Sequence, residues 1–222
     1  MQKEKHSKIY ILGAGGMARE VLQLLEDLNL ENSFTGFAVE RKYFDQKKDQ
    51  ILGKRIFEIE DIEPEGTKLI AAIGSPLRRN WIKSLKSKGF EFLTLVHPSV
   101  MIDKTVEIGE GAIICKSAVL TNQIKIGDFA IINICSSISH NCEIGNFTTV
   151  SPGVTIGGDV FIGEASWIGI GATVIQKITI GKGVFLGAGA VVIEDIVDNF
   201  LAYGVPAKPV REITEADWQE LI

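Results

Sequence analysis

The chain contains three histidines, and we consider first which of them could take part in proton transfer. A neutral imidazole accepts a proton near pH 7, so a well-placed histidine can serve as a general base. His6 lies in a polar N-terminal stretch, and His97 precedes Pro98 at a position that indicates a structural role. His140 is the remaining candidate, although a lone surface histidine is usually inert. From residue types alone, both interpretations of His140 stay open.

The chain also contains three cysteines, Cys115, Cys135 and Cys142, and Cys142 is the candidate nucleophile among them. Their odd number, without a secretion signal, argues against a disulfide framework, and no CxxC or histidine-rich spacing indicates a metal site. Cys142 would form a covalent enzyme intermediate if it were the nucleophile. Its phase in the repeat described below directs it inward, where cysteine behaves as a small hydrophobe. Chemistry without a covalent intermediate is therefore favoured.

A glycine-rich turn near the N-terminus has a spacing that suits phosphate. Gly13, Gly15 and Ala18 fit the pattern G-x-G-x-x-G/A between a predicted strand over Lys8–Leu12 and a helical stretch over Arg19–Leu28. Glycine lets the backbone approach a phosphate, and the helix N-terminus supplies N–H groups and a positive dipole. A full dinucleotide crevice needs two halves, and only about 95 residues precede the repeat. We favour one nucleotide over NAD, with a ligand-free tight turn as the alternative.

The elements that position these residues follow from a repeat of six. Stepping by six from Ile102 to Val192 meets isoleucine, leucine or valine at all sixteen positions. Small or β-branched residues predominate four places after each aliphatic residue, and glycine often follows it directly, as at Gly109 and Gly127. This period fits neither a helix nor an alternating hairpin. It predicts a three-sided coil of short strands whose aliphatic and small residues point inward, with glycine at the tight corners.

The region before the repeat alternates strands and helices. Besides Lys8–Leu12, strands are predicted over Phe34–Val39, Lys68–Ile73 and Phe90–Val96, with a helix over Pro76–Lys88. Such alternation indicates a parallel α/β sheet.

The repeat resembles that of the hexapeptide-repeat acyltransferases over roughly Val96–Val210. With the α/β region in front, the chain is similar to the group of sialic acid O-acetyltransferases and bacterial nucleotide-amino-sugar N-acetyltransferases. The motifs that carry this resemblance are the GAGG loop, Ala72-Ile73-Gly74, His97-Pro98, His140 and Gly204-Val205-Pro206-Ala207-Lys208. The resemblance implies a left-handed parallel β-helix, an exception to the usual right-handed crossover.

The expected organisation has three parts. Residues 1–97 form a small Rossmann-like α/β domain that binds a nucleotide sugar, and 98–211 form the left-handed β-helix with the acyltransferase site. Residues 212–222 form a capping segment whose apolar spacing suits a short amphipathic helix over the end of the coil, where unpaired strand edges would invite aggregation.

The resemblance implies transfer of an acetyl group from acetyl-CoA to a nucleotide-linked 4-amino sugar in bacterial glycan biosynthesis. His140 falls where these enzymes carry their base, and it would accept the proton that the amine loses in a direct, ternary-complex transfer. Asn141 stands where related enzymes can carry glutamate. A neutral amide can orient the ring but does not stabilise an imidazolium as a carboxylate would, so another acidic residue could substitute.

Binding residues are also implied by the resemblance. It predicts a homotrimer with acetyl-CoA in a groove between adjacent β-helices, active sites between subunits and no metal. The positions it assigns to the cofactor are Thr149, Gly158, Ile170, Ala188 and Lys208, the last with a solvated lysine as the alternative. The positions it assigns to the nucleotide sugar are Gly13, Gly15, Gly16, Met17, Val39, Glu40, Gly74 and Asn133. Met17 and Val39 depart from the polar residues of relatives, which leaves the base and sugar open.

Composition and charge limit which ligands, compartments and functions are expected for the chain. A net charge of −5 disfavours nucleic-acid binding, and the apolar stretches are too short to span a membrane. The charged N-terminus lacks a secretory signal, so the expected compartment is the cytoplasm. The alternatives are an O-acetyltransferase that acts on sialic acid or a related sugar with the same base, a non-catalytic nucleotide-sugar-binding module, and a purely structural solenoid. A zinc-dependent carbonic anhydrase is set aside because the repeat holds one histidine.

Overall fold

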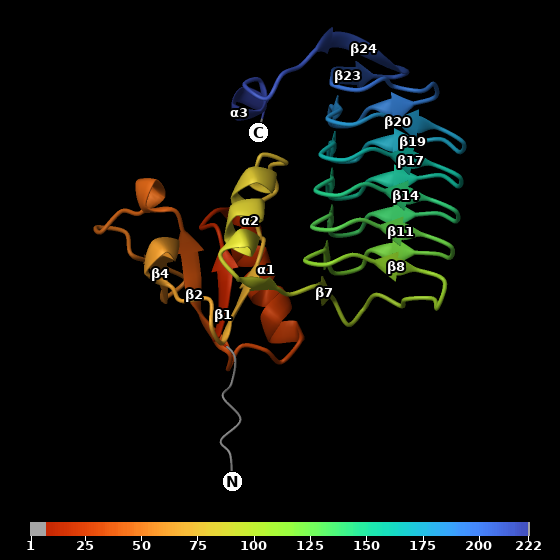
Figure 1. Cartoon of the computed structure of the whole chain (residues 1–222). Coiled ribbons are helices and arrows are strands. Elements are labelled where there is room, and N and C mark those ends of the chain that lie inside the picture. The colour runs from red at the N-terminus through yellow and green to blue at the C-terminus, as the bar shows by residue number, and fades with distance from the viewer. Residues whose placement is uncertain (1–7, 222) are drawn as a thin grey trace. The chain divides into compact units, whose positions relative to one another are not determined.

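The computed structural model describes residues 8–221, which form two compact units (Figure 1). The α/β unit holds the residues up to Gly74 together with Asn80–Leu93, and the β-helix unit holds Ser75–Arg79 and the chain from Thr94 onward. The predicted fold class, a small Rossmann-like domain followed by a parallel β-helix, is confirmed. His6 lies outside the described residues.

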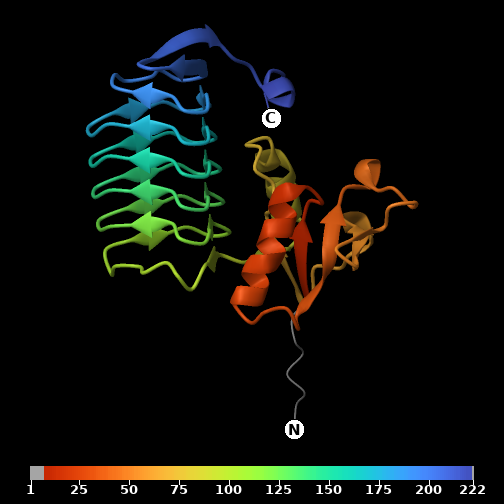
Figure 2. The ribbon, with the colours of Figure 1, turned by 180° about the vertical axis from the view of Figure 1, so that it is seen from behind.

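The α/β unit is a six-stranded sheet in the order β3-β4-β2-β1-β5-β6. Its pairs are parallel except for β3 with β4. The α2 helix lies in front of the sheet in Figure 1 and α1 in front of it in the reverse view of Figure 2, so the helices cover opposite faces. The elements are β1 (Lys8–Leu12), α1 (Gly16–Asp27), β2 (Phe34–Val39), η1 (Arg41–Tyr43), β3 (Gln50–Ile51), β4 (Lys54–Glu58), η2 (Ile59–Asp61), β5 (Thr67–Ile70), α2 (Arg78–Ser87) and β6 (Glu91–Phe92).

The α1 helix forms because its apolar residues recur at helical spacing. Ala18, Val21, Leu22 and Leu25 are all buried and make one stripe against the sheet. The helix begins at Gly16, three residues before the predicted start, so the last two glycines of the GAGG turn stand at its N-terminus.

Two strand predictions need correction. The strand predicted over Lys68–Ile73 ends at Ile70. The stretch Phe90–Val96 is not one strand, because its hydrogen-bond partners change between sheets. Leu93 N donates to Leu69 O in the α/β sheet, whereas Leu95 N donates to Ala112 O in the β-helix.

The β-helix has three sheets, which we call faces 1, 2 and 3, and their pairs are parallel except for the terminal pair β23 and β24. Face 1 holds β7 (Leu95–Val96), β9 (Ile113–Ile114), β12 (Ile131–Ile132), β15 (Thr149–Val150), β18 (Trp167–Ile168), β21 (Phe185–Leu186), β23 (Phe200–Gly204) and β24 (Ala207–Glu212). Face 2 holds β10 (Val119–Leu120), β13 (Ser137–Ile138), β16 (Thr155–Ile156), β19 (Thr173–Val174) and β22 (Val191–Val192). Face 3, whose strands are stacked in Figure 1, holds β8 (Glu107–Ile108), β11 (Lys125–Ile126), β14 (Glu143–Ile144), β17 (Phe161–Ile162) and β20 (Thr179–Ile180).

The core of the coil follows the predicted ladder. The aliphatic positions from Ile114 to Val192 are buried, and so are the small residues four places on. The inward hydroxyls of Thr148 and Ser166 donate to carbonyl oxygens of the next turn, at 2.8 and 2.9 Å, so these buried polar atoms are satisfied. Ile102 is 40% exposed and lies in the loop between β7 and β8, outside any strand, so the inward position predicted for it is wrong.

The glycines that directly follow the aliphatic residues do not form the tight corners of the coil, as had been predicted for them. The left-handed corner residue stands three places after each aliphatic position and is often not glycine, as at Ser117 and Phe129. A glycine directly after the aliphatic residue is required by close approach of the next coil. A Cβ at Gly127 would lie 2.6 Å from Asn146 N.

The C-terminal tail packs against the side of the coil. The β23–β24 hairpin pairs with β21 and occupies the coil end, so it covers the strand edges expected to be capped by the tail. The short α3 helix (Trp218–Leu221) places the Trp218 ring 5.6 Å from Phe185 on face 1. A short helix does form, but it lies against face 1.

Candidate functional site

His140 stands at the corner where β13 leads into β14, between faces 2 and 3. Its side chain is exposed, and its Nδ1 lies 2.8 Å from Asn141 Oδ1. The imidazole lies over Gly158 on the next coil, because a Cβ there would be 2.6 Å from His140 Nε2. His140, Asn141 and Gly158 are therefore brought together.

The corner backbone is held by the coils on either side of it. His140 O accepts from Asp159 N at 2.9 Å, and Asn141 N donates to Asn122 O at 3.2 Å. Asn141 has a left-handed φ of 61°, a conformation that asparagine adopts more readily than most residues. The imidazole thus projects from backbone that is fixed on both sides.

Cys142 points inward, as predicted from the period. It is buried, and its Sγ lies 3.1 Å from Gly157 O. Burial raises the pKa of the Cys142 thiol, which disfavours the thiolate needed for nucleophilic attack.

The residues predicted to bind acetyl-CoA are not all brought together. Ile170 is 61% exposed, and Ala188 is exposed one coil further along the corner between faces 1 and 2. Gly158 lies at the other edge of face 2. Thr149 is buried on face 1, and Lys208 forms an exposed ion pair with Glu194 at 3.0 Å.

Face 2 and its edges carry exposed apolar side chains. The exposed residues of this surface are Val119, Ile134, Ile170, Ile175 and Ile193. An exposed apolar surface of this kind is typical of a contact with another chain or a ligand.

Arg78 is a buried residue that the sequence did not single out. Its Nη1 donates to Thr149 Oγ1 at 3.2 Å, and its Nη2 donates to Phe129 O at 2.7 Å. Desolvation lowers the Arg78 pKa to about 9. Thr149 is thus held through a guanidinium. Asn133, a predicted sugar contact on face 1, turns its Oδ1 to Ile134 N at 2.8 Å.

The glycine-rich turn of the α/β unit stands at the carboxyl ends of three adjacent parallel strands. Gly13 has a φ of 95°, which favours glycine, and its N–H donates to Ala38 O at 2.9 Å. Gly15 is the N-cap of α1 and makes no side-chain cap, and no atom would meet a Cβ at Gly15 or Gly16 within 4 Å. Met17 is half-buried in the first turn. Open space therefore lies before N–H groups of the helix N-terminus.

A cavity of about 640 Å³ lies beside this turn. Of the residues predicted to bind the substrate, Val39 is buried and lines this cavity. Glu40 pairs with Lys42 at 3.2 Å. Gly74 follows β5 at the same edge of the sheet. The lining residues are Ala14, Arg19, Val39, Tyr43, Asp45, Lys47, Lys48, Asp49, Gln50, Ile51 and Ile56. Most come from the segment between β2 and β4, which no sequence pattern marked.

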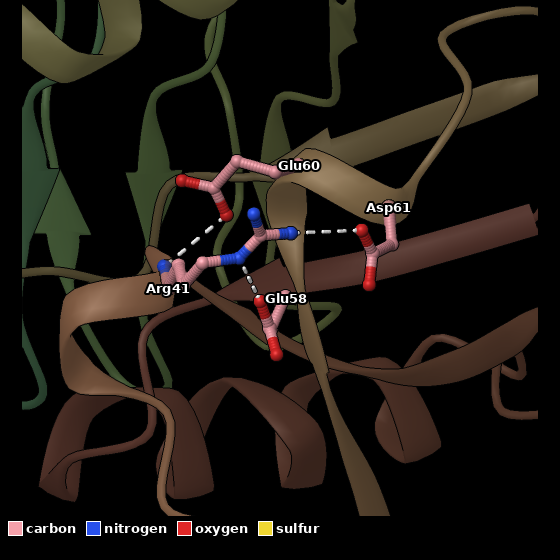
Figure 3. Close-up of polar contacts among 4 residues, drawn as sticks. All are labelled: Arg41, Glu58, Glu60 and Asp61. Carbon is pink, nitrogen blue, oxygen red and sulfur yellow. Dashed lines mark hydrogen bonds and ion pairs between the residues drawn. The ribbon is translucent and has the colours of Figure 1, made fainter.

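One arginine fixes the start of that segment. The side chain of Arg41 binds Glu58 through Nε and Asp61 through Nη2, and its backbone N donates to Glu60 (Figure 3). Glu58 is the last residue of β4, and Glu60 and Asp61 follow it in η2, so the Arg41 cluster joins the segment after β2 to the end of β4 and the turn behind it. The neighbouring carboxylates raise the Arg41 pKa above its ordinary value.

Over residues 8–221, no group of three or more histidine, cysteine or acidic side chains is arranged to hold a metal ion. In the same part of the chain, no helix has the length and apolar character needed to cross a bilayer.

Comparison with known families agrees with this architecture. The PglD N-terminal domain model matches residues 8–85, and the bacterial transferase hexapeptide model matches residues 159–194. The chain belongs to the hexapeptide-repeat acyltransferases, in the group that places a PglD-type domain before the β-helix.

Individual relatives sharpen this placement. The acetyltransferase domain of PglB from Neisseria gonorrhoeae is 30% identical, with a TM-score of 0.82 over 92% of this chain and 100% of that one, and it has also been solved with acetyl coenzyme A. A histidine-to-alanine variant of GDP-perosamine N-acetyltransferase from Caulobacter crescentus, in complex with CoA and GDP-perosamine, is 28% identical, with a TM-score of 0.81 over 92% of this chain and 97% of that one. UDP-N-acetylbacillosamine N-acetyltransferase from Bacillus subtilis is 30% identical over 108 residues, which span 48% of this chain and half of that relative.

Proposed function

We propose that the chain transfers the acetyl group of acetyl-CoA to the amine of a nucleotide-linked 4-amino sugar, with His140 as general base. The observation that carries this proposal is the exposed imidazole whose Nδ1 is engaged by Asn141 at 2.8 Å. When Nδ1 donates to the amide oxygen, Nε2 holds the lone pair and can accept a proton.

The proposed step is direct. The amine nitrogen attacks the thioester carbonyl and loses a proton to His140 Nε2 as the C–N bond forms. The C–S bond then breaks, and the imidazolium returns the proton to the leaving CoA thiolate. Buried Cys142, with its raised pKa, is unsuited to a covalent acyl-enzyme.

The α/β unit is proposed to bind the nucleotide. The glycine turn offers uncapped N–H groups for phosphate, and Lys47 and Lys48 add positive charge at the cavity wall. Among the relatives, one is named for a UDP-linked sugar and another for a GDP-linked sugar, so the experiment below tests more than one nucleotide.

We also propose that the active form is a homotrimer in which face 2 meets neighbouring copies. Gly158 and the pair Ile170 and Ala188 lie at opposite edges of face 2, so one chain cannot enclose acetyl-CoA between them. A second copy would supply the missing edge and cover the exposed apolar residues. Light scattering on the protein and on Ile170→Asp tests this, and an unchanged monomeric mass for both would overturn it.

Activity is tested by incubating the protein with acetyl-CoA and UDP-, dTDP- and GDP-linked 4-amino sugars while measuring released thiol. We expect one acceptor to react, His140→Ala to lose about 10²- to 10⁴-fold in kcat, and Cys142→Ala to retain activity. Release with sialic acid alone would replace the amine acceptor with a hydroxyl one. No release with any acceptor would favour a non-catalytic binding module.

A further inference from the structure

The imidazole of His140 is the first member of a short chain of polar side chains. Its Nδ1 meets Asn141 Oδ1 at 2.8 Å, and Asn141 Nδ2 in turn donates to Gln123 Oε1 at 3.4 Å. Gln123 lies eighteen residues before Asn141, at the same corner of the preceding coil, and both have left-handed φ values, 53° and 61°. The coil geometry therefore stacks the two amides.

The direction of this chain matters because an amide has two different ends. Asn141 can present either its oxygen or its NH₂ group to the histidine. Its oxygen requires Nδ1 to carry the proton and leaves the lone pair on Nε2. Its NH₂ group would require the opposite tautomer, with a proton on Nε2 and no basic atom there.

Gln123 is also an amide, and in the structure it presents Oε1, an acceptor atom, to the NH₂ group of Asn141. The Asn141 oxygen then faces His140, which is the first of these orientations. The Gln123 backbone is itself fixed, because Gln123 N donates to Thr105 Oγ1 at 2.8 Å.

We propose that Gln123 is a positioning residue that selects the Nδ1–H tautomer of His140 by setting the orientation of the Asn141 amide. A neutral asparagine beside a histidine does not by itself determine the tautomer of the ring. The contact with Gln123 would supply that orientation, although it adds no negative charge. Only the catalytic consequence rests on the proposed function, because the tautomer is a property of the protein alone.

The tautomer can be read directly from long-range ¹H–¹⁵N correlation spectra of the imidazole rings, at a pH where they are neutral. The chain has three histidines, so loss of one set of signals in His140→Ala assigns the ring. We expect the Nδ1–H form in the wild type and in Gln123→Glu, whose carboxylate still accepts. Gln123→Ala should relax to a mixture of tautomers.

Activity provides the second measurement. Gln123→Ala should lower kcat about three- to tenfold with KM unchanged, the effect of one ordinary hydrogen bond, and Gln123→Glu should restore it. Gln23→Ala, on the exposed side of α1, is the matched control and should change neither measurement.

An unchanged tautomer in Gln123→Ala would overturn the inference, and so would a mixture in Gln123→Glu. Full activity in His140→Ala would instead overturn the proposed base while leaving the tautomer result intact. Circular dichroism of each variant confirms that the coil is folded.

Discussion

The β-helix and the α/β unit position their candidate residues by different means. At the His140 corner, backbone hydrogen bonds recur with each turn, so neighbours along the axis are eighteen residues apart. At the carboxyl edge of the α/β sheet, strands end in loops of unequal length, and the Arg41 cluster joins two of them. A side chain is placed by the period in the first case and by particular side-chain contacts in the second.

This difference determines how a substitution is felt. Within the coil, two adjacent glycines can be required for different reasons. Gly157 faces the backbone of the next coil, whereas Gly158 faces the side chain of His140. In the α/β unit, the consequence of a change depends on which loop it releases.

The largest effect is expected from Gly158→Ala. Its Cβ would lie 2.5 Å from His140 Cε1 and 2.6 Å from Nε2, so the ring must move aside. A side chain yields more easily than backbone, so the fold should persist. We expect kcat to fall about 10²-fold because small displacements of a catalytic group have effects of this size. Thiol release and a thermal melt check this, and wild-type turnover in a folded variant would show that the ring tolerates the move.

Gly157→Ala should instead destabilise the coil. Its Cβ would lie 2.6 Å from Gln176 N, and backbone in a stacked sheet cannot rotate away. We expect the free energy of unfolding to fall by about 1–3 kcal/mol, as for other overpacked sites.

Gly171→Asn is the control for this substitution. Gly171 has a φ of 66° and open space around its Cβ position, and asparagine tolerates that backbone. Denaturant unfolding of both variants should separate them. Equal losses in the free energy of unfolding would mean that the backbone conformation at the corner, and not close contact between neighbouring coils, determines the effect at both glycines.

The same contrast explains what the sequence could predict. The six-residue period predicted that His140 faces outward and Cys142 inward. An interval of eighteen residues, which is one full turn, would also have placed Gly158 beside His140 and Gln123 beside Asn141. The period does not report rotamers, so the orientation of the Asn141 amide was not foreseen. Buried Arg78 was missed because a Pro-Leu-Arg-Arg stretch at a helix start has the appearance of a solvated turn.

In the α/β unit, β1 and β2 were predicted with their observed bounds because each is an apolar run before a turn. The segment between β2 and β4 is rich in charge and has no period, so neither β3 nor the cavity wall was predicted. The carboxylate of Glu40 is paired with Lys42, and the assignment of Glu40 to the nucleotide sugar stays a prediction.

A smaller effect is expected from Arg41→Gln, which removes the ion pairs of the Arg41 cluster. The side chains of Arg41 and Asp61 are 65% and 67% exposed, and only Glu58 is more covered, so these ion pairs contribute little to stability and unfolding should be almost unchanged. The loop that lines the cavity should loosen, and nucleotide affinity should fall about two- to fivefold, within the range of an exposed ion pair. Calorimetric titration with UDP, dTDP and GDP measures this, with Lys54→Gln as a charge-matched control. An unchanged Kd for the nucleotide would show that the cavity wall keeps its structure without the Arg41 cluster.

The smallest effect concerns the C-terminal tail. Asp217 accepts from Thr214 N at 2.7 Å, from Thr214 Oγ1 at 2.8 Å and from Arg211 Nη1 at 2.6 Å, and these bonds lower its pKa to about 2. Because the folded pKa is depressed, the contribution of Asp217 is complete above its ordinary value near 4 and is lost as the pH falls through about 2.

Trp218 reports this change, since its ring lies against Phe185. The fluorescence of Trp218 should change between about pH 4 and pH 2, whereas Asp217→Ala should show the altered signal already at pH 7 and no step on acidification. Trp218→Phe identifies the contribution among the three tryptophans. A step of the same size in Asp217→Ala would assign the transition to other carboxylates, and the packing of Trp218 against Phe185 would then hold the tail on face 1 without Asp217.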